Sequence, residues 1–188
     1  MNSSKKKIVR EAYDKIALSW NRLRNVPFPW VVDYLKRRKG SLLIEGCGSG
    51  RHSAYASLKF PVTAFDLSFE MIKLAKKNDK KGRYIVADAC HLPFKDKVFE
   101  HGLSIALFHH LNPDELVLAL KELRRVTKGD SLISVWKRKQ SGEQFIKWGN
   151  AKRYYYIYQT DEFKKIVSSV FNIKKDVSDE KNIILVIS

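Results

Sequence analysis

Cysteine is scarce in this sequence. The 188 residues include two cysteines, Cys47 and Cys90, and neither belongs to a C-x-x-C pair or lies at a zinc-binding spacing from histidine. A disulfide-stapled secreted scaffold and a metal site are therefore not expected. Two isolated thiols fit a reducing compartment, so we expect a cytoplasmic protein.

Long apolar segments are also missing. No run approaches the roughly 18 apolar residues needed to cross a bilayer. The amino-terminal stretch MNSSKKKIVREAYDKI is charged and lacks the apolar centre of a signal peptide. We expect no contact with a membrane.

Acidic residues are few relative to basic ones. The 20 Asp and Glu stand against 36 Lys and Arg, which gives a formal net charge of +16. Such an excess favours an anionic partner, most often nucleic acid. The alternative is a solvated, lysine-rich surface of the kind found in heat-adapted proteins.

Short apolar runs alternate with longer helical patterns. Buried strands are predicted at residues 41–46, 61–66, 83–88, 100–106 and 131–136. Helices are predicted at residues 5–24, 30–38, after Ser68, 114–127 and 161–169. The alternation predicts a parallel sheet covered on both faces, and the last two apolar runs predict a closing hairpin.

The first of these strands leads into a glycine-rich loop, Gly46-Cys47-Gly48-Ser49-Gly50. Such a loop lets a ligand approach the backbone closely. Asp66 and Asp88 end the next two strands, where one carboxylate can accept hydrogen bonds from ribose hydroxyls and the other can meet an adenine amino group. Each aspartate taken singly is equally consistent with an ordinary helix start. Because a dehydrogenase fingerprint requires G-x-G-x-x-G, the G-x-G-x-G pattern favours S-adenosylmethionine over a nicotinamide cofactor.

The stretches LLIEGCGSG, VTAFDLSFEMIKLAKK, VADACHLPF and FEHGLSIALFHH together resemble class I S-adenosylmethionine-dependent methyltransferases. The resemblance implies an α/β, Rossmann-like fold with helices on both faces of a seven-stranded, mostly parallel sheet that contains one antiparallel strand. It also implies a set of residues that bind S-adenosyl-L-methionine: Tyr13, Glu45, Gly46, Gly48, Gly50, Asp66, Leu67, Asp88, Ala89 and Ser104.

The chain departs from that family at the end of the first strand. The family carries an acidic residue two positions before the first glycine, where this chain has Ile44. Glu45 comes one position later, and a shift of one residue turns a strand side chain to the opposite face. Either the strand bulges and brings Glu45 back, or the role is empty.

The segments AYDKIALSWNRLRNVPFPWVVDYLK, SIALFHHL, SVWKRKQ and KRYYYIYQTDEFKKIV resemble the methyltransferases that act on tRNA wobble uridines. That family esterifies the carboxylate of 5-carboxymethyluridine in the anticodon stem-loop. It works as a heterodimer with a small zinc-ribbon activator, which the resemblance places at the edge formed by the third strand. Two features depart from the family: Tyr156 stands where histidine is usual, and the insert between Lys139 and Arg153 is short.

The chemistry of that reaction needs no general base, because a carboxylate is already ionised at neutral pH. The enzyme must instead hold an anion, which arginine does best through two parallel hydrogen bonds. The predicted catalytic residues are therefore Arg24, His110, Arg153 and Tyr154, with His110 preferred over His109. Tyr155 is the alternative to Tyr154, because only one of two consecutive strand residues can face the site. Cys47 and Cys90 lie in the cofactor loops and are not read as nucleophiles.

The elements run continuously, so a single methyltransferase domain is expected over residues 1–188. Within it, residues 1–40 form a helical cap over the cofactor site, 41–136 the cofactor-binding half, and 137–188 the substrate side and closing hairpin. Lysine-rich segments are expected to contact the tRNA backbone: Lys5–Lys7, Lys36–Lys39, Lys137–Lys139 and Lys152. Two other functions stay open, namely a methyltransferase for a small acid or phenol and a catalytically silent RNA-binding module.

Overall fold

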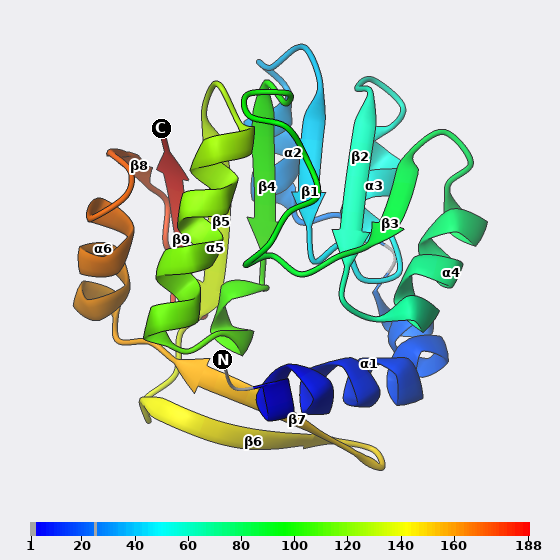
Figure 1. Cartoon of the computed structure of the whole chain (residues 1–188), viewed down its shortest axis with the longest axis vertical. Helices are drawn as coiled ribbons and strands as arrows, with labels where there is room; N and C mark the ends of the chain where they lie inside the picture. Colours follow the sequence, from blue (N-terminus) through cyan, green and yellow to red (C-terminus); the bar gives the residue numbers. More distant parts are fainter. Residues whose placement is uncertain (1–2, 25) are drawn as a thin grey trace.

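A seven-stranded sheet forms the centre of the computed structural model, which describes residues 3–24 and 26–188 (Figure 1). Its strand order is β3-β2-β1-β4-β5-β9-β8. The strands are β1 (Leu42–Glu45), β2 (Val62–Asp66), β3 (Arg83–Val86), β4 (His101–Ile105), β5 (Ser131–Trp136), β8 (Ile173–Asp176) and β9 (Asn182–Ile187). Strand β9 runs antiparallel to both of its neighbours, and the other pairs are parallel. The predicted sheet, its single antiparallel strand and the edge position of β3 are confirmed.

Alternate residues of the inner strands enter two separate cores, one on each face of the sheet. Leu43 packs in the core beneath α5 (Pro113–Val126) and α6 (Thr160–Ser168). Leu42 and Ile44 pack on the opposite side, beneath the helices α2 (Pro29–Leu35), α3 (Arg51–Ala56) and α4 (Phe69–Asn78). This alternation is what a parallel sheet buried on both faces requires.

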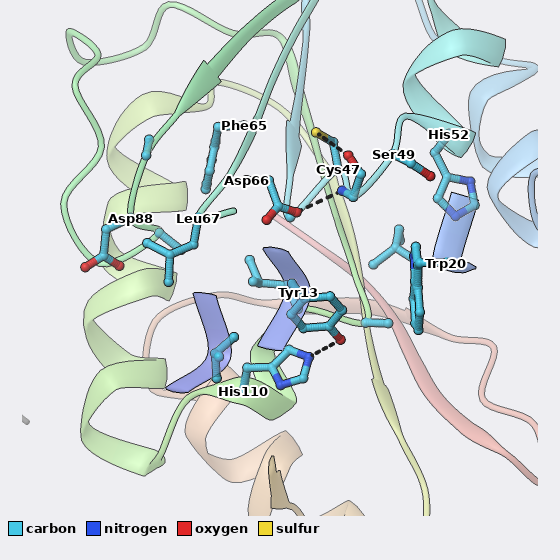
Figure 2. Close-up of a pocket in the computed structure, with 18 of the residues that line it drawn as sticks. Tyr13, Trp20, Cys47, Ser49, His52, Phe65, Asp66, Leu67, Asp88 and His110 are labelled. Atoms are coloured by element: carbon cyan, nitrogen blue, oxygen red, sulfur yellow. Dashed lines mark hydrogen bonds between the residues drawn. The ribbon is translucent and has the colours of Figure 1, made fainter. Parts of the chain in front are cut away.

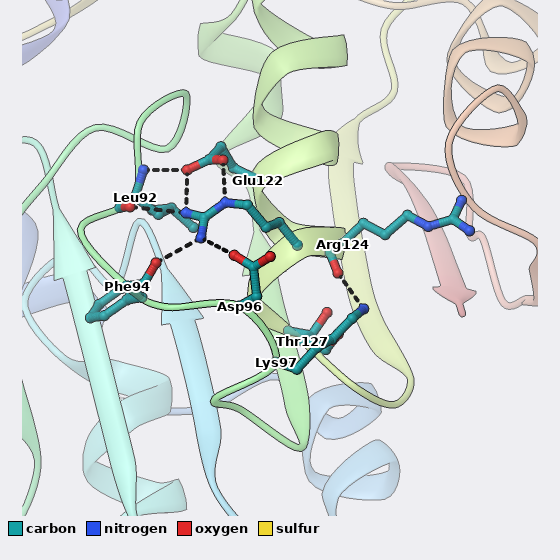
Figure 3. A network of polar contacts seen from close by, with 8 residues as sticks. Leu92, Phe94, Asp96, Lys97, Glu122, Arg124 and Thr127 are labelled. Atoms are coloured by element: carbon teal, nitrogen blue, oxygen red, sulfur yellow. Dashed lines mark hydrogen bonds and ion pairs between the residues drawn. The ribbon is translucent and has the colours of Figure 1, made fainter.

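One helix start and one loop position the strand ends. Ser68 accepts a hydrogen bond from the Met71 N–H at 3.1 Å and caps α4, as its position after Asp66 predicts. The loop after β3 is held by the Arg125 side chain on α5 (Figure 3). Its guanidinium donates to the Phe94 carbonyl at 2.7 Å and lies 2.7 Å from Glu122 Oε1. This network holds the loop that carries Asp88 and Ala89.

The remaining elements lie at the carboxyl ends of the parallel strands. Helix α1 (Ser3–Leu23) crosses below the sheet (Figure 1). A separate hairpin of β6 (Gly142–Trp148) and β7 (Ala151–Ile157) packs against α1. A two-residue turn joins Trp148 to Ala151, and Gly149 in that turn has a φ of 53°. A 3₁₀ turn, Phe108–His110, follows β4 on the same side. The sequence reasoning did not predict this hairpin.

Candidate cofactor and substrate site

A cleft opens between α1 and the carboxyl ends of the strands (Figure 2). Its volume is about 970 Å³, including the solvent-open mouth, which is the size of a small-molecule site. The predicted site residues that line it are Tyr13, Arg24, Gly46, Gly48, Asp66, Leu67, Asp88, Ala89 and His110. Arg153, Tyr154, Glu45, Gly50 and Ser104 do not line it.

The glycine loop adopts a backbone conformation, with positive φ angles, that glycine accepts more readily than other residues. Gly46, Gly48 and Gly50 have φ angles of 59°, 55° and 97°. A Cβ on Gly46 would lie 3.1 Å from the Leu107 side chain, and one on Gly50 would lie 3.1 Å from the Ala75 backbone. Although Gly50 does not line the cleft, its conformation is needed for the loop to turn into α3.

Asp66 fixes this loop from the neighbouring strand. Its carboxylate accepts the Gly48 N–H at 2.8 Å and the Ser68 N–H at 2.9 Å. Burial raises the pKa of Asp66 to about 6, although these hydrogen bonds partly oppose that rise. Each carboxylate oxygen keeps a second lone pair for a ligand hydroxyl.

Asp88 is tied to α1. Lys6 Nζ lies 2.6 Å from Asp88 Oδ2, and the Cys90 N–H donates to Oδ1 at 3.0 Å. Burial by itself would raise the pKa of Asp88, but these hydrogen bonds hold it below its ordinary value. Lys5 is also engaged, in an ion pair with Glu143. Lys5 and Lys6 therefore join α1 to neighbouring elements, whereas Lys7 pairs with Glu11 inside the helix at 3.9 Å. The sequence reasoning missed the role of Lys6.

Glu45 stays away from the cleft. Strand β1 pairs with β2 and β4 in continuous register, so it has no bulge that would return the side chain. The Glu45 side chain is 1% exposed, and its two carboxylate oxygens have no hydrogen-bond partner in the described part of the chain. Burial raises the pKa of Glu45 to about 8. Ser104 lies directly opposite Glu45 on β4 and is equally buried. In this structure neither residue reaches the cofactor cleft, and Ile44 packs in the core on the other face.

The two adjacent histidines, His109 and His110, make different contacts. His110 lines the cleft, and its Nδ1 lies 2.7 Å from the Tyr154 carbonyl, which can only accept. Nδ1 therefore carries the proton, and Nε2 accepts from the Tyr13 hydroxyl at 2.8 Å (Figure 2). Burial lowers the pKa of His110 to about 4, so the ring is neutral at pH 7. His109 turns instead toward Trp136, whose backbone N–H donates to His109 Nδ1 at 3.1 Å.

Arg153 lies behind the cleft wall inside an aromatic enclosure. Its guanidinium carbon is 5.8 Å from the ring of Tyr13, 5.6 Å from Trp20, 5.4 Å from Trp148 and 5.2 Å from Tyr155. Arg153 is 2% exposed, and its Nε and Nη1 atoms have no hydrogen-bond partner among the residues that the structure describes. A buried cation without a carboxylate is costly, so its presence here calls for an anion.

Tyr154 faces the other way. Its hydroxyl donates to Glu143 at 3.2 Å, and Lys5 Nζ lies 4.8 Å from its ring centroid. Only its backbone carbonyl reaches toward the cleft, through His110. The side chain on the inner face of β7 is that of Tyr155, which contacts both His110 and Arg153.

Nitrogen-bearing side chains gather at the glycine-loop end of the cleft, namely Arg24, Arg51 and His52. Arg24 lies 4.9 Å from the Trp20 ring, and Arg51 lies 4.1 Å from the Phe28 ring. Burial, and then the neighbouring Arg24, lowers the pKa of Arg51 to about 10. His52 also lines this end, and neither of its ring nitrogens has a hydrogen-bond partner among the described residues. Figure 2 shows Asp88 and His52 at opposite sides of the cleft, with Asp66 between them. The cleft is therefore acidic at one end and basic at the other.

The described part of the chain shows neither a metal-ligand cluster nor a membrane-spanning helix. Within residues 3–24 and 26–188, no three His, Cys, Asp or Glu side chains come together as metal ligands. None of the described helices combines the length and apolarity that a membrane span needs.

Comparison with known proteins identifies the family. A family model described as a methyltransferase domain matches residues 43–135. A tRNA (carboxymethyluridine(34)-5-O)-methyltransferase of Arabidopsis thaliana is 34% identical over 149 residues, which make up 76% of this chain and 36% of that protein. The chain belongs to the class I S-adenosylmethionine-dependent methyltransferases.

Further matches agree with this family. The protein of the same name from Schizosaccharomyces pombe is 30% identical over 141 residues, which are 72% of this chain and 60% of its own length. The solved DhpI–SAH complex has a TM-score of 0.81 at 13% identity, covers 100% of this chain and 98% of its own, and shows the fold. The chain thus spans between about a third and three fifths of the length of the two curated relatives.

The residues of this methyltransferase fit its cofactor. The cradle formed by Gly46 and Gly48 leaves backbone atoms open to the cleft, and Asp66 keeps free lone pairs beside it. Asp88 and Ala89 lie at the acidic end, where an adenine amino group would find an acceptor. When bound, S-adenosylmethionine supplies an electrophilic methyl group on a sulfonium.

Proposed function

We propose that this methyltransferase esterifies the carboxylate of 5-carboxymethyluridine at the wobble position of tRNA, in the cytoplasm. The observation that carries the proposal is Arg153, whose guanidinium is buried beside the cleft and has two nitrogens without a hydrogen-bond partner within residues 3–24 and 26–188. A carboxylate is the anion that a planar guanidinium holds best. The names of the Arabidopsis and Schizosaccharomyces relatives support the same substrate.

S-adenosylmethionine would supply the methyl group, and Arg153 would hold the substrate carboxylate facing it. No proton moves, so no general base is needed. His110 is neutral and hydrogen-bonded on both ring nitrogens, and it therefore orients groups without supplying charge. The positive charge comes from Arg153. Because Tyr13 and Trp20 line the cleft and also contact Arg153, movement of either ring would open the guanidinium to the substrate.

The three segments of the chain are proposed to have different roles in binding the cofactor and the tRNA. Residues 1–40 would cap the cofactor, since α1 is joined to the strand ends through Lys6 and through Asp14, which accepts from the Ser68 hydroxyl at 2.5 Å. Residues 41–136 would hold the cofactor. Residues 137–188 would face the anticodon stem-loop, where Lys137, Lys139 and Lys152 are exposed.

The exposed edge of β3 is proposed to bind a small zinc-ribbon activator as a heterodimer. Of the described strands, β2 alone pairs with β3, and Val86 at the end of β3 is 48% exposed. An unpaired edge of this kind can accept a strand from another chain. Co-expression with such an activator should raise yield and cofactor affinity. Full yield and affinity of the chain alone would count against the heterodimer.

Nucleoside mass spectrometry of tRNA from cells that lack the gene tests the substrate. We expect loss of the wobble methyl ester with retention of the free acid. Unchanged methyl ester would refute the proposal, and methylation of free small acids or phenols by the purified enzyme would support the small-molecule alternative. The silent RNA-binding alternative requires that calorimetry detect no binding of S-adenosylmethionine.

A further inference from the structure

The outer face of the β6–β7 hairpin carries an exposed aromatic ring. Phe145 is 44% exposed. Its ring meets that of Tyr154, directly opposite on β7, at a centroid distance of 5.7 Å and an interplanar angle of 66°. Lys152 Nζ lies 4.6 Å from the Phe145 centroid. The ring is thus held from one side by Tyr154 and remains accessible to a ligand.

Two ammonium groups accompany this ring without a counterion. Lys147 and Lys152 lie directly opposite each other in the hairpin, and both are exposed. Like charges at directly opposed positions destabilise a β-ladder. Among residues 3–24 and 26–188, no ion pair engages either ammonium group. A bound anion would relieve this repulsion.

The position of the surface connects it with the cleft. Lys152 directly precedes Arg153, so consecutive residues of β7 present one cation outward and one into the aromatic enclosure. Trp148, next to the hairpin turn, belongs to the same enclosure as Arg153. The hairpin therefore carries both the inner wall behind the cleft and the outer surface of Phe145, Lys147 and Lys152.

We propose that Phe145, Lys147 and Lys152 bind an unpaired nucleotide of the substrate RNA, next to the nucleotide held in the cleft. The base stacks on the Phe145 ring, and its phosphate lies at the lysine pair. This combination of an aromatic face with backbone-neutralising cations is how proteins hold single-stranded nucleic acid. The inference rests on the proposed function, because it takes the anticodon loop as the substrate.

Fluorescence anisotropy with a labelled anticodon stem-loop tests the surface. Phe145→Ala should weaken binding at least about fivefold, the lower end of a lost stacking contact. Phe145→Tyr should bind like wild type, whereas Phe145→Leu should bind like Phe145→Ala, because leucine keeps apolar bulk without a stacking face. Lys147→Met should lower the slope of log affinity against log salt by about 1. Leu118→Ala, an exposed apolar position on α5, is the matched control and should change nothing.

The outcomes separate this inference from the proposed function. Calorimetry with S-adenosylhomocysteine should give equal affinities for wild type and all variants, which shows that the fold persists. If wild type binds the stem-loop with steep salt dependence and Phe145→Ala binds equally well, the nucleotide surface is refuted while the proposed function stands. Equal binding by Phe145→Leu and Phe145→Tyr would refute stacking. If wild type itself does not bind the stem-loop, both proposals fall.

Discussion

Replacement of Arg153 by methionine tests whether this buried cation serves substrate recognition or stabilises the fold. Exchange of a buried charge for an apolar side chain of similar length ranges from neutral to about 4 kcal/mol stabilising. The lost contacts with four aromatic rings oppose that gain by about 0.5–1 kcal/mol each. The net change in the unfolding free energy should therefore lie between a gain of about 2 kcal/mol and a loss of about 4 kcal/mol, which corresponds to a shift in Tm of no more than about 16 °C.

Activity should respond quite differently. A bidentate, charge-assisted hydrogen bond contributes about 1.5–3 kcal/mol. Its loss should lower kcat/KM for a carboxymethyluridine stem-loop by about 10- to 150-fold. The assay is transfer of a labelled methyl group to that RNA, combined with thermal unfolding and calorimetry with S-adenosylhomocysteine, whose affinity should not change.

The control is Arg153→Lys, which keeps the charge and loses the planar fork. It should retain more activity than Arg153→Met and less than wild type. If Arg153→Met keeps kcat/KM within threefold of wild type, the guanidinium does not recognise the substrate. If it instead unfolds with a loss well beyond about 4 kcal/mol, the cation stabilises the fold and the reasoning from its missing partners is wrong.

Two further predictions concern buried carboxyl groups. The folded-state pKa of Glu45, about 8, lies above the ordinary value of about 4.3. Between these two pH values the folded protein keeps a proton on Glu45 that the unfolded chain has released. Stability should fall as pH rises through that window, by at most about 1.4 kcal/mol per pH unit, and urea titrations of Glu45→Gln should lack that slope. Asp66→Asn should weaken S-adenosylhomocysteine binding about tenfold. In wild type the affinity should fall below about pH 6 as Asp66 becomes protonated, and a flat calorimetric profile would exclude Asp66 from the cofactor contacts.

Much of the sheet and its helices could be predicted because their signals are local. The strand that ends at Asp66 and the helix capped by Ser68 follow from neighbouring residues in the chain. The stripe of Leu116, Leu120 and Leu123 on α5 is fully buried, as its helical spacing predicts. The continuous register of β1 also decides a question that the sequence left open, since it leaves Glu45 in the core.

What the sequence could not predict depends on contacts between distant segments. Trp20 and Trp148 enclose Arg153 only because α1 packs on the hairpin. Lys6 pairs with Asp88, which lies 82 residues away in the sequence, and no periodic pattern in the sequence predicts such a pair. A Gly-Asn turn between two alternating runs was the available signal for the missed hairpin, and it marks the turn at Gly149.

The most direct measurement of the central claim compares two stem-loops that differ in one functional group. One carries the free acid 5-carboxymethyluridine at the wobble position and the other carries the corresponding amide, which has the same shape without the negative charge. The enzyme, alone or with the proposed zinc-ribbon activator, should transfer a labelled methyl group to the acid at least 100-fold faster than to the amide, as a buried guanidinium that recognises a carboxylate requires. Equal transfer to both, or transfer to neither while a free small acid is methylated, would contradict the account.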